Sequence, residues 1–385
     1  MSGVEGDSTT LTNALVRREM VRNMVIGLDI GTSAVRAAEV DVKKNPPVLA
    51  RFGQITLPSG AVRDGEIIDE QVVSDTLTEL WGNARFKSKR VIVGVANQRI
   101  IVRQVEMPWM EASDLEAGLA FQVQDHLPIP VEDAILDFQI LEEFPGEENE
   151  RMMRVLLVAA QREMINSLVR TLKMAGLRPK TIDLVPFALI RTLALEHRLQ
   201  PEVVDRADID GLDELEKDPG TAEAIVDIGA GITNIVVHEQ GLPRFVRILV
   251  AGGDDITEAL STVMGSSYEK AEDLKCHLTP ERTSEEAMRV VEERLQTMVE
   301  EVRGSLEYYR AQTKSARLAR VVLTGGGAQM PHLLDRMEAS TGVRAEMGHP
   351  LSTVRLGKLG MAHDQIVAAE SLISVPVGLA LGDAL

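Results

Sequence analysis

The hydrophobic positions of this chain alternate between short apolar runs, typical of buried strands, and spaced stripes, typical of helices. Apolar runs at 25–30 and 35–41 predict two strands, and the stripe at 71–81 predicts a helix. The same kind of pattern returns later, with strands predicted at 224–228 and 232–238. Strands that alternate with helices in both halves predict an α/β fold with largely buried sheets.

One long helix is predicted at 284–313, where apolar side chains recur at spacings of three and four. These side chains are Met288, Val291, Leu295, Met298, Val302, Leu306 and Tyr309. The stripe predicts a helix that packs against a core, although the seam of a coiled coil has the same pattern over this length.

Residues 107–150 have a different pattern of hydrophobic and turn residues from the segments around them. Ser113 and Glu116 have the spacing of a capping box, so a helix is predicted to begin there, and Pro128 is expected to end it. An alternating run at 135–141 predicts a half-buried strand. An acidic turn that contains glycine and proline is expected after this strand.

Two segments are predicted to lie outside the packed fold. Residues 201–223 contain nine acidic and two basic side chains, a net charge of −7, which predicts a mobile acidic linker or insertion. Residues 1–22 lack the continuous apolar stretch of a signal peptide, so a disordered tail is predicted there.

The overall charge of the chain argues against some classes of binding partner. The chain has 41 basic and 59 acidic side chains, a net charge of −18, which argues against binding to nucleic acid or to an anionic membrane surface. No run of 18 apolar residues occurs, so direct membrane insertion is not expected. The single cysteine, Cys276, excludes a disulfide framework and fits a reducing cytoplasm.

The most informative motif occurs twice. Residues 29–36 read Asp-Ile-Gly-Thr-Ser-Ala-Val-Arg, and residues 227–233 read Asp-Ile-Gly-Ala-Gly-Ile-Thr. Each follows an apolar strand and leads into another, and the two aspartates are 198 positions apart, about half of the chain (227 − 29 = 198). The repeat predicts two related lobes, each with a strand–turn–strand hairpin at the same place.

The residue types in these two turns favour phosphate binding. Glycines let the backbone approach a phosphate closely, consecutive N–H groups form an anion-binding nest, and hydroxyls add donors. The candidate phosphate ligands are Gly31, Thr32, Ser33, Arg36, Gly229, Gly231 and Thr233. Asp29 and Asp227 are candidates to hold a hydrated Mg²⁺. The alternative is that both motifs are simple hairpin turns, because aspartate and glycine are common turn residues.

Further candidates come from the second half of the chain. The glycines at 325–327 follow an apolar run, and there a base or a ribose could lie against the backbone. The candidate nucleotide-binding residues of this part are Gly252, Gly253, Lys270, Glu272, Lys275, Gly325, Gly326, Gly327 and Ala328. The charged side chains among them are equally compatible with a solvated helix face. The Walker A and the G-x-G-x-x-G motifs are both absent.

These motifs together resemble the actin-like ATPase superfamily. Residues 29–36 and 227–233 resemble its two phosphate motifs, and 323–331 resembles its adenosine motif. The helix after Pro186 and residues 377–382 resemble its two connecting helices. The resemblance implies an actin-like (ribonuclease H-like) two-lobed α/β fold with a nucleotide cleft that holds ATP and Mg²⁺.

Residues 107–138 resemble, more specifically, the insertion subdomain of the PilM family, the cytoplasmic assembly proteins of type IV pili. This resemblance implies a first-lobe core at 23–106 and 151–200, an FtsA-like insertion subdomain at 107–150, and a second lobe at 224–385.

The PilM resemblance also implies partners and a location. The first partner is the cytoplasmic N-terminal tail of PilN, an inner-membrane protein, in a groove expected at about 111–141. The pilus motor ATPases are further candidates. The protein is then expected to be cytoplasmic and to reach the inner membrane through its partner, as a nucleotide-binding scaffold.

Departures from the superfamily bear on catalysis. Actin orients its attacking water with a glutamine on the helix that corresponds to the one after Pro186. Counted without gaps, Leu193 occupies that position, so at most weak ATPase activity is expected. Nearby residues such as Gln161 are alternative candidates for orienting the water. Residues 371–385 contain no lysine or arginine, unlike the basic tail by which FtsA reaches the membrane. An FtsA-like filament protein and an active ATPase or phosphotransferase of the same fold stay open as alternatives.

Overall fold

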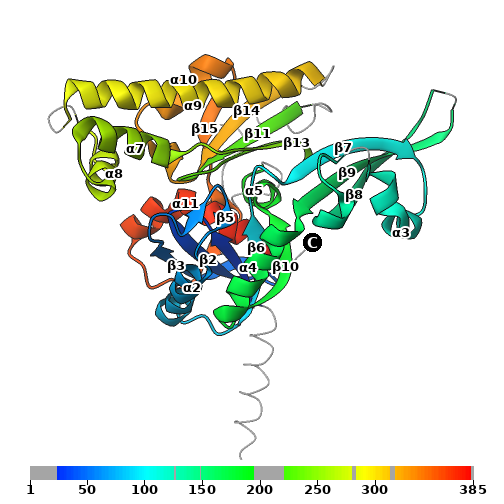
Figure 1. Ribbon diagram of the computed structural model, residues 1–385, viewed down its shortest axis with the longest axis horizontal. Coiled ribbons are helices and arrows are strands. Elements are labelled where there is room, and N and C mark those ends of the chain that lie inside the picture. Colours follow the sequence, from blue (N-terminus) through cyan, green and yellow to red (C-terminus); the bar gives the residue numbers. More distant parts are fainter. Residues whose placement is uncertain are drawn as a thin grey trace, which may run out of the picture.

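The computed structural model describes residues 24–124, 127–147, 149–194, 221–279, 283–312 and 317–382. Two sheets dominate, with helices around and between them, and a smaller sheet projects to one side (Figure 1). The predicted tail at 1–22 and most of the predicted linker at 201–223 lie outside the described residues.

The first large sheet has the strand order β10-β6-β1-β2-β3-β16. Its strands are β1 (Met24–Ile30), β2 (Ala34–Asp41), β3 (Val48–Thr56), β6 (Arg90–Val95), β10 (Arg178–Leu184) and β16 (Arg355–Leu356). A short hairpin, β4 (Val62–Arg63) with β5 (Glu66–Ile67), lies between β3 and β6 in the chain.

The second large sheet has the order β13-β12-β11-β14-β15. Its strands are β11 (Thr221–Ile228), β12 (Thr233–Glu239), β13 (Leu242–Leu249), β14 (Arg317–Thr324) and β15 (Arg344–Met347). In each sheet three antiparallel strands are followed by two strands parallel to the first of them. This shared topology confirms the α/β fold and the repeat of a strand–turn–strand unit.

The helices form layers around the two sheets. They are α2 (Glu70–Ala84), α4 (Arg162–Met174), α5 (Val185–Leu193), α7 (Gly253–Met264), α8 (Tyr268–Cys276), α9 (Glu285–Gln312), α10 (Leu333–Thr341) and α11 (His363–Leu381), with short 3-10 turns η5 (Gly327–Gln329) and η6 (Pro350–Ser352). The helices α2 and α4 pack on one face of the first sheet, α5 and α11 lie between the sheets, and α7, α9 and α10 cover the outer face of the second.

The side chains on alternate positions of the central strands explain this layering. In β11, Val226 packs toward α9, whereas its neighbour Ile225 packs toward α5 and α11. Helix α11 crosses β1 so closely that a Cβ on Gly27 would lie 2.0 Å from the carbonyl oxygen of Pro376. By length and composition α11 could cross a membrane, but here it packs inside the fold, and Ile373 and Val377 are fully buried.

The long helix α9 matches its predicted range to within one residue at each end. Six of the seven predicted side chains, from Val291 to Tyr309, are buried in the core of the second lobe, and Met288 is half-buried. The stripe therefore packs against the helix's own sheet and is not a free coiled-coil seam.

The small sheet has the order β7-β9-β8 and carries a short helix. Its elements are β7 (Ile101–Pro108), α3 (Ala112–Gln122), η2 (Val131–Asp133), β8 (Ala134–Pro145) and β9 (Arg151–Gln161). One face of this sheet packs on α3 through Leu115, Leu119 and Val123, all of them buried. This segment is called the insertion subdomain below.

The predicted ends of α3 are wrong. The backbone N–H groups of Asp114 and Leu115 both donate to the carbonyl of Glu111, which is the N-cap, so Ser113 already lies inside the first turn. The helix ends at Gln122, well before Pro128, and the buried Val123 is its C-cap. The strand β8 is longer than predicted because it pairs with β9 as far as Pro145.

Three predicted boundaries differ from the structure. The insertion subdomain was predicted at 107–150, but its sheet spans 101–161, because β7 and β9 pair with each other along nearly their whole length. Residues 221–223 belong to β11 and not to the acidic linker, because Glu223 is buried and paired with Arg320 of β14. The end of the chain was expected in the second lobe. Instead, β16 pairs with β3 of the first sheet, and α11 packs on β1 and β2.

Candidate functional site

A cavity of about 470 Å³ lies between the two lobes, a size typical of small-molecule sites. The two repeated turns and the glycine turn after β14 all reach it. Its polar and glycine lining includes Asp29, Gly31, Thr32, Ser33, Arg36, Gln54, Asp227, Gly229, Asn234, Gly253, Glu272, Lys275, Gly325, Gly326, Gly327 and Gln329. The topological repeat therefore brings both Asp-Ile-Gly turns to one cavity.

In the first lobe, the turn between β1 and β2 is closed by a backbone hydrogen bond in which the Gly31 N–H donates to the carbonyl of Ala34 at 3.0 Å. Asp29 and Arg36 are opposite each other in the strand register, and their side chains form an ion pair at 3.5 Å. Arg36 also donates through Nε to Gln54 Oε1 at 2.9 Å. The guanidinium is thereby oriented at the cavity wall.

The second lobe repeats this arrangement with one change. The Gly229 N–H donates to the carbonyl of Ile232 at 2.9 Å, and Asp227 stands opposite Asn234. Asn234 Nδ2 donates to Asp227 Oδ2 at 3.0 Å, so an amide takes the place that Arg36 has in the first lobe. Asn234 Oδ1 is buried and has no hydrogen-bond partner within the described residues.

The two aspartates are in an unfavourable environment for two negative charges. Burial raises the pKa of Asp29, and this effect outweighs the opposing charge of Arg36. Burial also raises the pKa of Asp227, to about 6, with a further contribution from the charge of Asp29, while the hydrogen bond from Asn234 opposes the rise. A cation beside both carboxylates would relieve this cost.

Close backbone approaches hold the turns together. A Cβ on Gly231 would lie 2.8 Å from Thr32 Oγ1, so the two turns touch across the cavity mouth. A Cβ on Gly252 would lie 2.2 Å from the carbonyl oxygen of Ala230, and the Gly253 N–H donates to the Gly229 carbonyl at 3.0 Å. The start of α7 is therefore packed directly on the second Asp-Ile-Gly turn.

The glycine turn after β14 completes the wall. Gly325 has φ +86°, and a Cβ there would lie 2.6 Å from Asp227 Oδ1, so only glycine fits. Its N–H donates to the carbonyl of Ser371 on α11, and Gln329 Nε2 donates to Ser371 Oγ at 2.6 Å. The turn is thus fixed to α11, the helix between the lobes.

A charged pair on α8, Glu272 and Lys275, lines the cavity next to the start of α7. Lys275 Nζ lies 2.6 Å from Glu272 Oε2 and donates to the carbonyl of Gly253 at 3.0 Å. It also donates to Thr257 Oγ1 at 2.8 Å. The ammonium and the carboxylate are therefore held beside the cavity by the start of α7 and are not a purely solvated face.

Five of the predicted site residues do not line the cavity. Thr233 donates its hydroxyl to the carbonyl of Ala251 at 2.8 Å, so it ties β12 to the turn before α7. Gly231 and Gly252 serve the close approaches described above, Lys270 is exposed, and Ala328 is buried in the second-lobe core.

Several cavity residues were missed by sequence reasoning, among them the amide side chains Gln54, Asn234 and Gln329. Asn234 had a detectable signal, because it stands 198 positions after Arg36, the spacing of the two aspartates. Leu193 is buried in the core around α5 and α11, and Gln161 accepts a hydrogen bond from Arg99 at 3.2 Å. Neither lies at the cavity wall.

Comparison with known proteins assigns the family. The family described as "Type IV pilus assembly protein PilM" matches residues 27–384, nearly the whole chain. This chain belongs to the PilM family. As a member, it is a type IV pilus assembly protein with an actin-like fold, which confirms the expected family and function.

One solved structure agrees with this assignment, and other relatives are similar over most of the chain or share its fold. A structure titled "PilM-PilN type IV pilus biogenesis complex" is 26% identical, covers 94% of this chain and 98% of that chain, and has a TM-score of 0.78. The cell division protein FtsA of Neisseria meningitidis is 24% identical over 91% of each chain. MreB 5 of Spiroplasma citri shares the fold at 13% identity, with a TM-score of 0.50 and coverage of 92% and 94%.

The residues of the cavity fit a nucleotide with a divalent cation. The N–H-rich turns, one from each lobe, suit phosphate oxygens, and the two buried carboxylates suit a cation that keeps part of its water. Within the described residues, no group of three or more His, Cys, Asp or Glu side chains could hold a metal alone. The unpartnered Asn234 Oδ1 offers a further acceptor beside Asp227.

Proposed function

We propose that this PilM-family protein is an ATP-binding scaffold that binds the cytoplasmic N-terminal tail of PilN. The single observation that supports this best is the structural match to a PilM–PilN complex along nearly the full length of both chains. The cavity between the lobes supports the nucleotide part, because both repeated turns meet there.

In this proposal the nucleotide lies across both lobes. Its phosphates lie against the turns that contain Gly31 and Gly229, and Asp29 and Asp227 hold a hydrated Mg²⁺ beside them. The ion neutralises phosphate charge when it is bound. Glu272 and Lys275 are proposed to contact the ribose and the base, because both line the same cavity and form an ion pair there.

Efficient hydrolysis is not part of the proposal. A water-orienting side chain must lie within hydrogen-bond reach of the attacking water. Leu193 is apolar and buried, and Gln161 lies outside the cavity lining. Gln54 does line the cavity, but its amide oxygen accepts from Arg36. At most weak ATPase activity is expected, so the nucleotide serves to hold the lobes in one arrangement.

The PilN tail is proposed to bind the insertion subdomain at about 111–141, on and beside α3. The helix buries Leu115 and Leu119 against its own sheet, but Phe121 is 83% exposed on its last turn. An exposed aromatic side chain on a small subdomain is a suitable anchor for an extended peptide. The partner would bring this otherwise cytoplasmic protein to the inner membrane, where motor ATPases are further candidate partners.

Fluorescence anisotropy of a labelled PilN-tail peptide tests the partner proposal. The wild-type chain is expected to bind the peptide, and Phe121→Ser is expected to weaken binding at least tenfold. Met174→Ser is the matched control, because Met174 is also an exposed apolar side chain (49%) but lies on α4 of the first lobe. Absence of binding by the wild-type chain, with or without Mg·ATP, would refute the proposal.

A second candidate function is an FtsA-like filament protein, which the FtsA matches over most of the chain favour. It predicts nucleotide-dependent polymers that sediment at high speed. The scaffold proposal predicts that the chain stays in the supernatant with Mg·ATP at the same concentration.

A further inference from the structure

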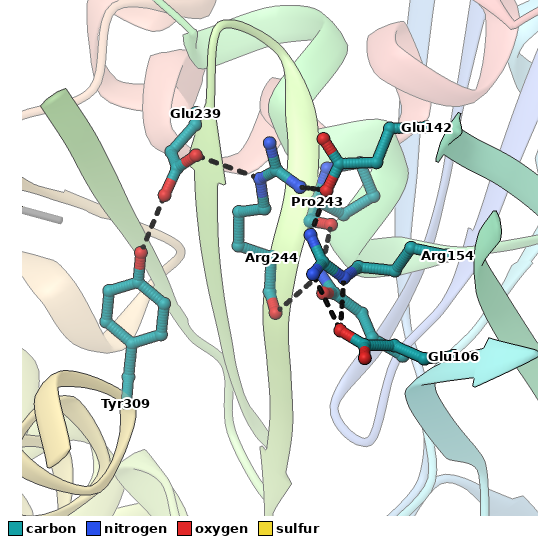
Figure 2. Close-up of polar contacts among 8 residues, drawn as sticks. Glu106, Glu142, Arg154, Glu239, Pro243, Arg244 and Tyr309 are labelled. Atoms are coloured by element: carbon teal, nitrogen blue, oxygen red, sulfur yellow. Dashed lines mark hydrogen bonds and ion pairs between the residues drawn. The ribbon is translucent and has the colours of Figure 1, made fainter. Parts of the chain in front are cut away.

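The insertion subdomain contacts the second lobe through a polar bridge at the far end of the β12–β13 hairpin (Figure 2). Arg244 on β13 lies 3.7 Å from Glu142 of β8, and the same carboxylate pairs with Arg154 of β9. Arg154 also pairs with Glu106 of β7 at 2.7 Å. One glutamate of the insertion subdomain is therefore shared between an arginine of its own sheet and an arginine of the second lobe.

A second set of hydrogen bonds crosses the same boundary. Gln104 Nε2 of β7 donates to the carbonyls of Pro243 and Arg244, at 3.4 and 3.2 Å. Both β7 and β13 are edge strands of their sheets, and no backbone pairing joins them in the described residues. Each polar contact of the bridge thus involves a side chain, which meets either another side chain or a backbone carbonyl of β13.

The second-lobe end of the bridge is held firmly. Glu239 accepts from Arg244 Nε at 3.0 Å and from the Tyr309 hydroxyl of α9 at 3.2 Å (Figure 2). Phe245 packs against the rings of Tyr308 and Tyr309, with centroids about 6 Å away. Arg244 therefore moves with the hairpin and with α9, and not independently of them.

The other end of the same hairpin forms part of the cavity. The strands pair from Thr233 with Leu249 to Glu239 with Leu242, which spans roughly 20 Å at ~3.3 Å per residue. The register shifts between Val237 and His238, where Arg244 is the extra residue of β13. At the cavity end, Asn234 lines the wall and Thr233 is bonded to the turn before α7. The paired strands carry a shift of the cavity end as far as Phe245, and the hydrogen bond from Arg244 to Glu239 makes Arg244 follow it.

The contact itself is suited to form and break. A polar cleft of about 1010 Å³ lies beside it, and Glu142 and Glu106 are 41% and 54% exposed. Partly exposed ion pairs contribute little stability individually. Because the insertion subdomain is continuous with the first lobe through β7 and β9, a rotation of the lobes must either carry this bridge along or open it.

We infer that the β12–β13 hairpin couples the nucleotide cavity to the insertion subdomain, with Arg244 as the positioning residue of the coupling. This rests on the proposed function, because it assumes that nucleotide and PilN tail bind at the two ends. Binding of either ligand then changes the affinity for the other by the same factor. Both ligands shift the equilibrium between the formed and the broken bridge.

The test measures that factor directly in the full-length chain. The dissociation constant of Mg·ATP is determined by titration calorimetry with and without a saturating PilN-tail peptide, and that of the peptide with and without Mg·ATP. The wild-type chain is expected to show a change of about fivefold or more, equal in both directions. Arg244→Gln is expected to reduce the factor to less than twofold while each ligand alone still binds.

Arg247→Gln is the matched control. Arg247 lies on the same strand and beside the same cleft, is exposed, and makes no ion pair within the described residues, so its loss should leave the factor unchanged. If Arg244→Gln does not fold, Gln104→Ala removes the two hydrogen bonds that cross the boundary from the insertion subdomain, and it is also expected to reduce the factor.

Each outcome decides a different claim. An unchanged factor in Arg244→Gln and Gln104→Ala, or an equal loss in Arg247→Gln, overturns the inference and leaves the proposed function in place. The inference is also overturned if both ligands bind the wild-type chain and neither changes the dissociation constant of the other. If the peptide fails to bind at all, the proposed function falls, and the inference falls with it.

Discussion

Replacing Asp227 with asparagine should stabilise the free protein and weaken its nucleotide site at the same time. The side chain is only 8% exposed, stands near the charge of Asp29, and has a pKa of about 6. The ordinary value is 3.8, so ionising this carboxyl in the fold costs about 3 kcal/mol at ~1.4 kcal/mol per pH unit. Asparagine keeps the shape of the side chain and avoids this cost.

The sign of the pH dependence follows from the raised pKa. Between about pH 4 and pH 6 the folded chain retains a proton that the unfolded chain has lost, so the stability of the wild type falls as the pH rises. Above pH 6 the full cost of about 3 kcal/mol applies, and below pH 4 it disappears. The variant lacks this contribution at every pH.

Thermal unfolding of the ligand-free chain at pH 8 and pH 4 is the appropriate assay. Asp227→Asn is expected to unfold about 5 °C above the wild type at pH 8 and at the same temperature at pH 4. Added Mg·ATP should raise the unfolding temperature of the wild type and have little effect on the variant. Asp133→Asn, at an exposed aspartate of η2, is the control and should change neither.

Two results would refute this reasoning. A variant that is no more stable than the wild type at pH 8 would mean that Asp227 is not strained by burial and by Asp29. A variant that retains the full effect of Mg·ATP would mean that this carboxylate does not hold the cation.

Three further predictions test other parts of the account. Gly231→Ala places a Cβ 2.8 Å from Thr32 Oγ1 and should weaken Mg·ATP binding about tenfold by separating the two turns, as calorimetry would show. In Gly27→Ala the new Cβ would clash with the carbonyl oxygen of Pro376, so the variant should lose at least ~3 kcal/mol of stability in denaturant unfolding. Gly82→Ala, whose Cβ would lie in open space on α2, should instead stabilise the chain by up to ~1 kcal/mol. Burial alone would raise the pKa of Glu223, but His238 and Arg320 lower it to about 2. Glu223→Gln should therefore cost about 3 kcal/mol of stability at pH 7 and remove this residue's contribution to the loss of stability between pH 4.5 and 2. An unchanged acid transition would contradict this.

The repeat and the hydrophobic periodicity were sufficient to predict the fold class and the meeting of both Asp-Ile-Gly turns at one site. These are local patterns, and the two copies support each other. The helix α9 was also predicted within a residue of its ends, because its apolar face is regular.

The failures concern side chains whose role is decided by distant partners. Thr233 was expected to face a phosphate, but its hydroxyl meets the carbonyl of Ala251, 18 residues away. Glu223 was counted with a solvated acidic segment, yet Arg320, 97 residues away, makes its burial possible. Likewise, the apolar α11 gives no sign in its own sequence that it packs on the first sheet.

The central claim is that the two repeats together form one nucleotide site. Titration of Mg·ATP into the full-length chain, followed by the same titration into Asp29→Ala, tests it most directly. The account predicts one site per chain, and a loss of affinity of at least tenfold in the variant, because each lobe supplies one carboxylate to the same cavity. No binding to the wild type, two sites per chain, or unchanged affinity in Asp29→Ala would contradict it.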